Sequence, residues 1–311
     1  AVLDVLCSFA VVSVKNDYTR PVINLSGKLY LKDSRHPVVE ALLHDTPFVP
    51  NDVDMDMNDN RVAIITGPNM AGKSTYMRQI AIITIMAQIG CFVPAAVAEV
   101  GIVDAIFTRV GASDDLSAGQ STFMIEMAEV ADILKNATKD SLIVFDEIGR
   151  GTSTFDGMSI ARAVLEYVHD KKLVGAKTLF ATHYHELTAM EDILPGVKNF
   201  NIAVKKRGDD ITFLRRIVRG GADDSFGIEV AKLAGVPDKV IKRAKQVLAE
   251  LEQNGGEDKR TSHHRFSEEP IQLTMASVDG EVLQKLRSLD VNALTPIQCM
   301  NTLFELCSML K

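Results

Sequence analysis

A short glycine-containing segment has the residue types and the spacing that hold phosphate groups. Residues 67–75 read G-P-N-M-A-G-K-S-T and satisfy the pattern Gly-x-x-x-x-Gly-Lys-Ser/Thr. Glycines let the backbone curl so that its N–H groups point at phosphate oxygens, and the helix that follows adds a positive dipole. We expect Lys73 to contact the β- and γ-phosphates of a nucleotide and Ser74 to ligate Mg²⁺. The predicted phosphate-binding residues are Gly67, Pro68, Asn69, Met70, Ala71, Gly72, Lys73, Ser74 and Thr75.

Two acidic residues follow a second apolar run, L-I-V-F at 142–145. A phosphate-binding loop of this kind needs one carboxylate near Mg²⁺, and Asp146 is in the position for it. The next residue can polarise the attacking water, which makes Glu147 the candidate general base. Apolar runs that end in acids are common, so the alternative is that Glu147 is a solvated surface residue. Its place downstream of 67–75 favours the catalytic interpretation.

A histidine follows a third apolar run, T-L-F-A at 178–181. Ligands bind beyond the carboxyl ends of the strands in parallel sheets, and His183 would lie at such an end. It could sense the γ-phosphate or help to hold the attacking water. The alternative is a structural role, which we assign to His185 on the same loop.

Two polar segments have many hydroxyl and backbone N–H donors. They are 114–123 (D-D-L-S-A-G-Q-S-T-F) and 149–157 (G-R-G-T-S-T-F-D-G). Both could complete a nucleotide site, even across a subunit boundary. The alternative is ordinary turn and helix-capping chemistry.

The elements that must position these residues alternate between strand and helix. The short apolar runs 62–66, 142–145 and 178–181 indicate buried strands, and 158–171 is typical of a helix. This alternation predicts an α/β domain with a mixed, largely parallel sheet. Before it, residues 1–60 indicate a helix followed by loops and strands, with 51–60 as an acidic surface loop. After it, 201–218 indicates a hairpin that turns at 208–210.

One stretch, 79–98, has no charged residue and is mostly apolar. Its length would suit a membrane span, but Gly90 and Pro94 interrupt it and the sequence G-K-S-T lies just before it. A helix buried in the core of a globular domain is the better interpretation.

The C-terminal part of the chain changes character. Residues 227–234 and 239–252 are two helical runs separated by G-V-P-D, which is a helix-turn-helix in outline. Packing is favoured over DNA reading for this pair. A polar linker begins at 253. Near the end, 297–310 is an apolar helical stripe, for which we favour an oligomer contact over docking onto the chain's own domain.

Composition limits the function classes. The 311 residues are 46% hydrophobic and have a net charge of −7, which indicates a globular protein and argues against a surface that grips nucleic acid throughout. The four cysteines are scattered, so we expect reduced thiols and a cytoplasmic location rather than disulfides or a zinc site. No signal peptide is evident and the sequence begins with Ala1, which we interpret as a fragment of a longer protein.

These stretches together resemble the ATPase region of the MutS family of DNA mismatch-repair proteins, and more closely its bacterial members. The segments that carry the resemblance are TGPNMAGKSTYMRQ, FTRVGASDDLSAGQSTFMIEMAE, DEIGRGTSTFDG, FATHYHELT, SFGIEVAKLAGVP and LTPIQCMNTLFELCSMLK. The resemblance implies a P-loop ATPase of ABC type that binds ATP or ADP with Mg²⁺ and works as a homodimer with two composite sites. Further implied partners are mismatched DNA in the full-length protein and a MutL-like repair protein, with no membrane involved.

The resemblance also assigns roles to single residues. Phe48 and Val49 would pack against the adenine, and Ser121 would reach the γ-phosphate bound by the partner subunit. His183 would be the switch histidine. Ala71 departs from the family pattern, which often has glycine there; we expect this small change to fit. The mismatch-reading and clamp domains of the family have no counterpart in this sequence.

By the same resemblance, residues 1–22 would be a remnant of lever helices and 23–222 the ABC-type domain. Residues 223–252 would form a helix-turn-helix that buttresses a dimer, 253–277 a linker, and 278–311 a helical tail that could extend the dimer to a tetramer. The predicted function is ATP binding and hydrolysis coupled to mismatch binding. The alternative is a nucleotide-gated dimerisation or signalling module with negligible hydrolysis in isolation. A MutS-like paralogue outside repair is disfavoured because the terminal helices carry no nuclease-like extension.

Overall fold

The computed structural model describes residues 1–43, 46–68, 71–110, 121–207, 210–221 and 226–258. The chain divides into two compact units, 1–247 and 248–311. Several predictions lie outside the described residues: the placement of Asn69 and Met70, most of the polar segment 114–123, the turn at 208–209, and the C-terminal segment 278–311.

The first unit contains a six-stranded sheet in the order β10-β9-β4-β8-β7-β6. Four of the five pairings in this sheet, β9-β4, β4-β8, β8-β7 and β7-β6, are parallel, and only β10 runs antiparallel to its neighbour β9. This confirms the predicted mixed, largely parallel sheet and its three buried strands. The strands are β4 (Val62–Thr66), β6 (Ile106–Val110), β7 (Leu142–Asp146), β8 (Lys177–Ala181), β9 (Val197–Arg207) and β10 (Asp210–Arg219).

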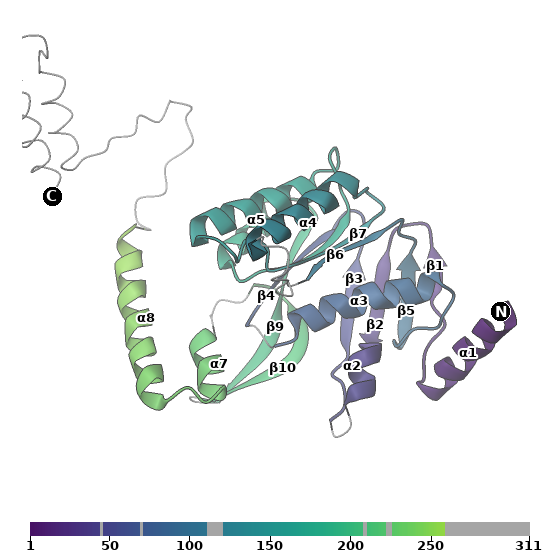
Figure 1. The fold of residues 1–311 in the computed structure, drawn as a ribbon, viewed down its shortest axis with the longest axis horizontal. Helices are drawn as coiled ribbons and strands as arrows, with labels where there is room; N and C mark the ends of the chain where they lie inside the picture. The colour runs from purple at the N-terminus through teal and green to yellow at the C-terminus, as the bar shows by residue number, and fades with distance from the viewer. Residues whose placement is uncertain (44–45, 69–70, 111–120, 208–209, 222–225, 259–311) are drawn as a thin grey trace, which may run out of the picture. The chain divides into compact units, whose positions relative to one another are not determined.

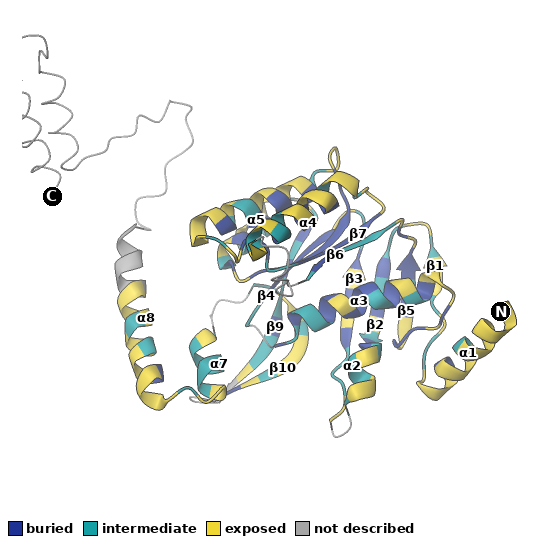
Figure 2. Cartoon of the chain, in the orientation of Figure 1, coloured by how far each residue is buried: buried dark blue, intermediate teal, exposed yellow. Residues whose placement is uncertain are grey.

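Helices cover both faces of this sheet (Figures 1 and 2). Alternate residues of the central strands therefore pack into two different hydrophobic cores. Ala63 and Ile65 of β4 pack with α3 (Lys73–Gln88). Val62 and Ile64 pack on the other face with α4 (Thr122–Asn136) and α5 (Thr154–His169). Strands buried on both faces have no polar side to show, which is why they are apolar throughout.

Helix α3 accounts for much of the uncharged run 79–98, and its inner face is buried as predicted. The run is not one helix, however. Helix α3 ends at Gln88, Gly90 has φ +85°, and β5 (Val97–Gly101) follows. Within the described residues, every helix is too short or too polar to cross a membrane.

A second sheet has the order β1-β5-β2-β3. One of its strands contradicts a prediction from the sequence. Residues 51–60 were expected to form a surface loop, but Asn51–Met55 is strand β3. Asn51, Val53 and Met55 are buried, whereas Asp52 and Asp54 point to solvent. The acidic residues hid a two-residue alternation that is typical of a half-buried strand. The other strands are β1 (Val22–Asn24) and β2 (Leu29–Ser34), with helices α1 (Val2–Lys15) and α2 (Pro37–Leu42) nearby in the sequence.

The two helices predicted after the sheet are present, and two short helices that were not predicted lie between β8 and β9. The short helices η2 (His185–Ala189) and α6 (Met190–Ile193) follow β8, and α7 (Gly227–Leu233) follows β10. Helix α8 begins at Asp238 but continues to Asp258, past the predicted end at 252 and into the predicted linker. Extending a helix that has already nucleated requires little per residue, so Gly255 and Gly256 do not stop it.

Candidate nucleotide-binding site

The predicted phosphate-binding loop connects the end of β4 to the first turn of α3. Gly67 has φ +129° and Gly72, the N-cap of α3, has φ +113°. These backbone angles are rarely open to residues with a side chain, which accounts for both glycines of the pattern. Ala71 is buried and has no positive φ, so its methyl group fits, as expected. The loop leads directly into the positive end of a sixteen-residue helix.

Lys73 is the buried cation of this loop, with only 3% of its side chain exposed. Its Nζ donates to the carbonyl oxygen of Gly67 at 2.5 Å and lies 3.7 Å from Oε1 of Glu147. Burial lowers the pKa of Lys73, and the carboxylates of Glu147 and Asp146 oppose that shift. The ammonium group therefore lies across the loop, where a phosphate oxygen could take the place of the Gly67 carbonyl.

The end of β7 places Asp146 against the start of α3. The Ser74 hydroxyl hydrogen-bonds the Asp146 carboxylate, and burial raises the pKa of Asp146 above its usual value. Oδ1 of Asp146 is buried and has no hydrogen-bond partner among the described residues. A buried carboxylate oxygen without a donor is costly unless a cation completes it. The pair Ser74 and Asp146 thus fits a hard cation such as Mg²⁺.

The rest of a Mg²⁺ shell would come from outside the protein. Among the described residues, no group of three or more His, Cys, Asp or Glu side chains could enclose a metal ion. Mg²⁺ is usually held by one or two protein oxygens together with waters and phosphate oxygens. The two oxygens at Ser74 and Asp146 match that pattern.

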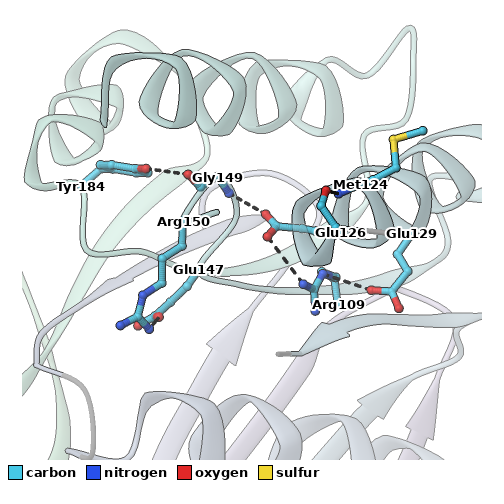
Figure 3. Close-up of polar contacts among 9 residues, drawn as sticks. Arg109, Met124, Glu126, Glu129, Glu147, Gly149, Arg150 and Tyr184 are labelled. Atoms are coloured by element: carbon cyan, nitrogen blue, oxygen red, sulfur yellow. Dashed lines mark hydrogen bonds and ion pairs between the residues drawn. The ribbon is translucent and has the colours of Figure 1, made fainter. Parts of the chain in front are cut away.

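Glu147 directly follows β7 in an unusual backbone conformation, with φ +56°. Such a conformation is uncommon for a residue with a side chain and stores on the order of 1–3 kcal/mol, so it tends to occur at functional sites. Its N–H donates to the Ala181 carbonyl at 2.9 Å, which ties it to the end of β8. Oε2 of Glu147 accepts from the guanidinium of Arg150 at 2.6 Å (Figure 3). Arg150 was not singled out from the sequence, although it lies in the polar segment 149–157.

His183 lies on the loop that follows β8. The N–H of the preceding residue, Thr182, donates to the carbonyl oxygen of Ile65 in β4, which fixes the start of this loop. Partial burial lowers the pKa of His183, and the charge of Glu147 opposes the shift. Lys73 and Arg150 are close enough to lower that pKa further. The structure therefore brings Lys73, Glu147 and His183 together where three parallel strands end.

Phe48 and Val49 lie beside the same loop, although they are distant from it in sequence. They line a cavity of about 220 Å³ together with Gly72, Thr75 and Tyr76. The lining also includes Asn51 and Arg215 of β10, neither of which the sequence singled out.

Asn51 holds the irregular part of β10 at this cavity. Its side-chain Nδ2 donates to the Arg215 carbonyl at 3.0 Å, and its Oδ1 accepts from the N–H of Ile217 at 2.7 Å. Arg215 has φ +55°, and the pairing of β9 with β10 shifts register between Phe213 and Ile217. No local signal in the sequence marks this bulge, because the residue that holds it, Asn51, belongs to the other sheet.

Ser121 is not brought to these residues. It is exposed and caps α4, where its hydroxyl accepts from the N–H of Met124 at 3.2 Å. Within the described part of the chain, no hydrogen bond joins Ser121 to Lys73, Glu147 or His183. The segment that precedes it, 111–120, lies outside the described residues.

Residues 63–252 match the family MutS domain V, which is more than half of the chain. The chain belongs to the MutS family. This confirms the predicted resemblance to that family, and the motif segments 66–79, 107–129, 146–157 and 180–188 all lie within the matched residues.

Relatives named "DNA mismatch repair protein MutS" match along nearly all of the sequence. The protein of Caldicellulosiruptor bescii is 58% identical over 98% of this chain, and that of Ruminiclostridium cellulolyticum is 57% identical over 98%. The protein of Clostridium tetani is 50% identical over the whole chain. The chain spans only 36–38% of the length of these relatives.

Proposed function

We propose that this part of the MutS family is an ABC-type P-loop ATPase module that binds ATP or ADP with Mg²⁺ and hydrolyses ATP. The observation that carries the proposal is the convergence at one sheet edge of a buried lysine, an unsatisfied carboxylate oxygen on Asp146, and Glu147 in a strained conformation.

Binding would be dominated by the loop and by Lys73. The N–H groups of the first turn of α3 point toward the anion, and Lys73 exchanges the Gly67 carbonyl for β- and γ-phosphate oxygens. Ser74 and Asp146 hold Mg²⁺, which when bound neutralises charge on the phosphates. The cavity beside Phe48 and Val49 receives the base, whose flat apolar faces suit its lining.

Hydrolysis would use Glu147 as the base. A water oxygen forms a bond to the γ-phosphorus, the bond from that phosphorus to the oxygen bridging to ADP breaks, and the water proton passes to Glu147. Lys73 and Arg150 both pair with the Glu147 carboxylate, so the carboxylate would exchange a cation contact for the attacking water when it acts as the base. His183, neutral at pH 7 because its pKa is lowered, could hold that water by accepting or donating one hydrogen bond.

The assembly and the biological setting are part of the proposal. The relatives' name, DNA mismatch repair protein, supports a role in mismatch repair. We propose that the full-length protein is cytoplasmic and couples its nucleotide state to the binding of mismatched DNA. The family resemblance suggests a homodimer in which Ser121 acts on the partner's nucleotide. Helices α7 and α8 would buttress that dimer, and a MutL-like protein would be a further partner. The 278–311 segment could extend the dimer to a tetramer.

The test is to separate binding from turnover with Glu147→Ala. Calorimetric titration should give ATP affinity close to that of the unmodified protein, whereas phosphate release should fall by about 100-fold or more. Glu166→Ala is the control, since Glu166 is an exposed carboxylate on α5 paired only with Arg162 among the described residues. Unchanged phosphate release in Glu147→Ala would refute the assignment. Sedimentation with and without ATP then tests the alternative of a nucleotide-gated dimer, which predicts association without turnover.

A further inference from the structure

The peptide groups on either side of Gly149 are held by two other elements of the fold. The N–H of Gly149 donates to Oε1 of Glu126 in α4 at 2.6 Å. The carbonyl oxygen of Gly149 accepts from the hydroxyl of Tyr184 at 3.0 Å. Figure 3 shows both bonds meeting at Gly149, with Glu147 and Arg150 on the same turn. A residue that is fixed on both sides cannot shift unless one of these partners shifts.

The Glu126 carboxylate is unusual for a helix that covers a sheet. It is 6% exposed, and its second oxygen lies 3.6 Å from the guanidinium of Arg109, which is equally buried. Burying a charged pair is expensive, and apolar residues of similar size would often be at least as stable. A carboxylate retained here is therefore better explained by what it holds than by general packing.

Tyr184 makes the second bond and directly follows His183. It is also buried, and its ring lies 4.2 Å from the His183 ring, centroid to centroid. Gly157 of α5 closes the space around this bond: a Cβ there would overlap both the Gly149 carbonyl oxygen and the Tyr184 hydroxyl. Gly149 has φ +85°, so it also needs to be glycine.

We propose that Glu126 and Tyr184 are positioning residues that hold Gly149 and thereby set Glu147 and His183 relative to each other. Glu147 lies two residues before Gly149, Arg150 lies one residue after it, and His183 is joined to Tyr184. The inference rests on the proposed ATPase function. It adds a route by which a displacement of α4, whose N-cap is Ser121, would reach the residues proposed to hydrolyse ATP.

The route is made of one buried ion pair and two hydrogen bonds, and three substitutions separate their contributions. Glu126→Ala removes the acceptor for Gly149. Glu126→Gln retains an oxygen that can accept from the Gly149 N–H but loses the charge facing Arg109. Tyr184→Phe removes only the hydroxyl. Glu129→Ala is the matched control, because Glu129 also pairs with Arg109, at 3.1 Å, but is half exposed and makes no hydrogen bond to Gly149.

The experiment measures kcat, KM and ATP affinity for each variant, with the thermal midpoint as a check on folding. Glu126→Ala should lower kcat by about tenfold or more, because small displacements of reacting groups are costly, while ATP affinity stays within about twofold. Glu126→Gln should recover most of the loss, and Glu129→Ala should match the unmodified protein. Tyr184→Phe should be milder, and its effect should not add to that of Glu126→Ala, since both act on Gly149.

An independent readout does not depend on turnover. In protein labelled with ¹⁵N-glycine, the Gly149 amide should exchange with solvent more slowly than in Glu126→Ala, and Glu126→Gln should restore the protection. If the unmodified protein releases no phosphate from ATP, the proposed function fails and this inference fails with it. If it does, and Glu126→Ala keeps the full kcat, only the positioning inference is overturned. Equal losses of kcat in Glu126→Ala and Glu126→Gln, with the Gly149 amide still protected in both variants, would also overturn it.

Discussion

The loop that ends at Lys73 and the loop that begins at Glu147 lie at the same sheet edge but are built differently. The first is held by its own sequence: two glycines with positive φ, a helix that starts at once, and a lysine bonded to the first glycine. The second depends on residues from other elements. The N–H of Glu147 donates to Ala181, and Gly149 is bonded through its N–H to Glu126 and through its carbonyl oxygen to Tyr184. In the proposed function, nucleotide binding would therefore depend mainly on local sequence, whereas the geometry for hydrolysis would depend on tertiary contacts.

The largest expected effect is on the local loop. Lys73→Ala removes the buried cation that we propose neutralises phosphate. Truncating one partner of a buried charge pair typically costs about 3 kcal/mol, or roughly 100-fold in affinity. ATP titration by calorimetry should therefore show little or no binding. Lys171→Ala, at an exposed lysine beyond α5, is the control. Tight binding retained by Lys73→Ala would remove the contrast between the two loops.

A smaller effect is expected where α5 meets the second loop. Gly157→Ala places a methyl group against the Gly149 carbonyl and the Tyr184 hydroxyl, and overpacking of this kind destabilises by about 1–3 kcal/mol. Chemical denaturation should show this loss, and kcat should fall more than ATP affinity. Gly227→Ala is a matched control, since a Cβ there meets no described atom within 4 Å. Equal stability of the two variants would contradict the close approach at Gly149.

Asp146→Asn probes the point where the two loops meet. Because burial raises the pKa of Asp146, the folded state disfavours the charged form at neutral pH, and the substitution should leave the nucleotide-free protein as stable or slightly more stable. The free energy of unfolding of the unmodified protein should rise by about 2.7 kcal/mol at a Mg²⁺ concentration 100 times the dissociation constant. The variant should gain much less, as followed by thermal unfolding with and without Mg²⁺. A gain equal to that of the unmodified protein would place the cation elsewhere.

The smallest expected effect is the pH dependence at His183. Its pKa is lowered from the ordinary value of 6.5 in the folded protein, so the unfolded chain binds the proton more readily. This contribution to stability is fully present above pH 6.5 and declines as the pH falls from there toward the folded pKa. Denaturation at a series of pH values, compared with His183→Gln, should show a shallower acid decline in the variant. Identical slopes would mean that the ring is not desolvated in the folded protein.

Part of this fold could be predicted because its signals are local. The strand at 62–66, the loop at 67–75 and the acids after 142–145 each have a pattern that reports backbone conformation or chemistry within a few residues. Strand β3 was missed because its signal is not local. Positions 52 and 54 hold aspartates that face solvent, and which face of the strand is buried depends on its pairing with β2. The extension of α8 past Gly255 was missed because local glycine propensity was weighed without the helix that precedes it.

The sequence by itself determined a glycine loop with the phosphate-binding pattern, a candidate cation ligand, a candidate base and a largely parallel sheet to carry them. Only the tertiary structure decided that Phe48 shares a cavity with Tyr76 and Arg215, that Arg150 covers Glu147, and that Glu126 and Tyr184 meet at one glycine. The reason is physical. A loop's own backbone angles are encoded by the residues that adopt them, whereas a buried hydrogen bond between distant segments is encoded by the packing of everything between them.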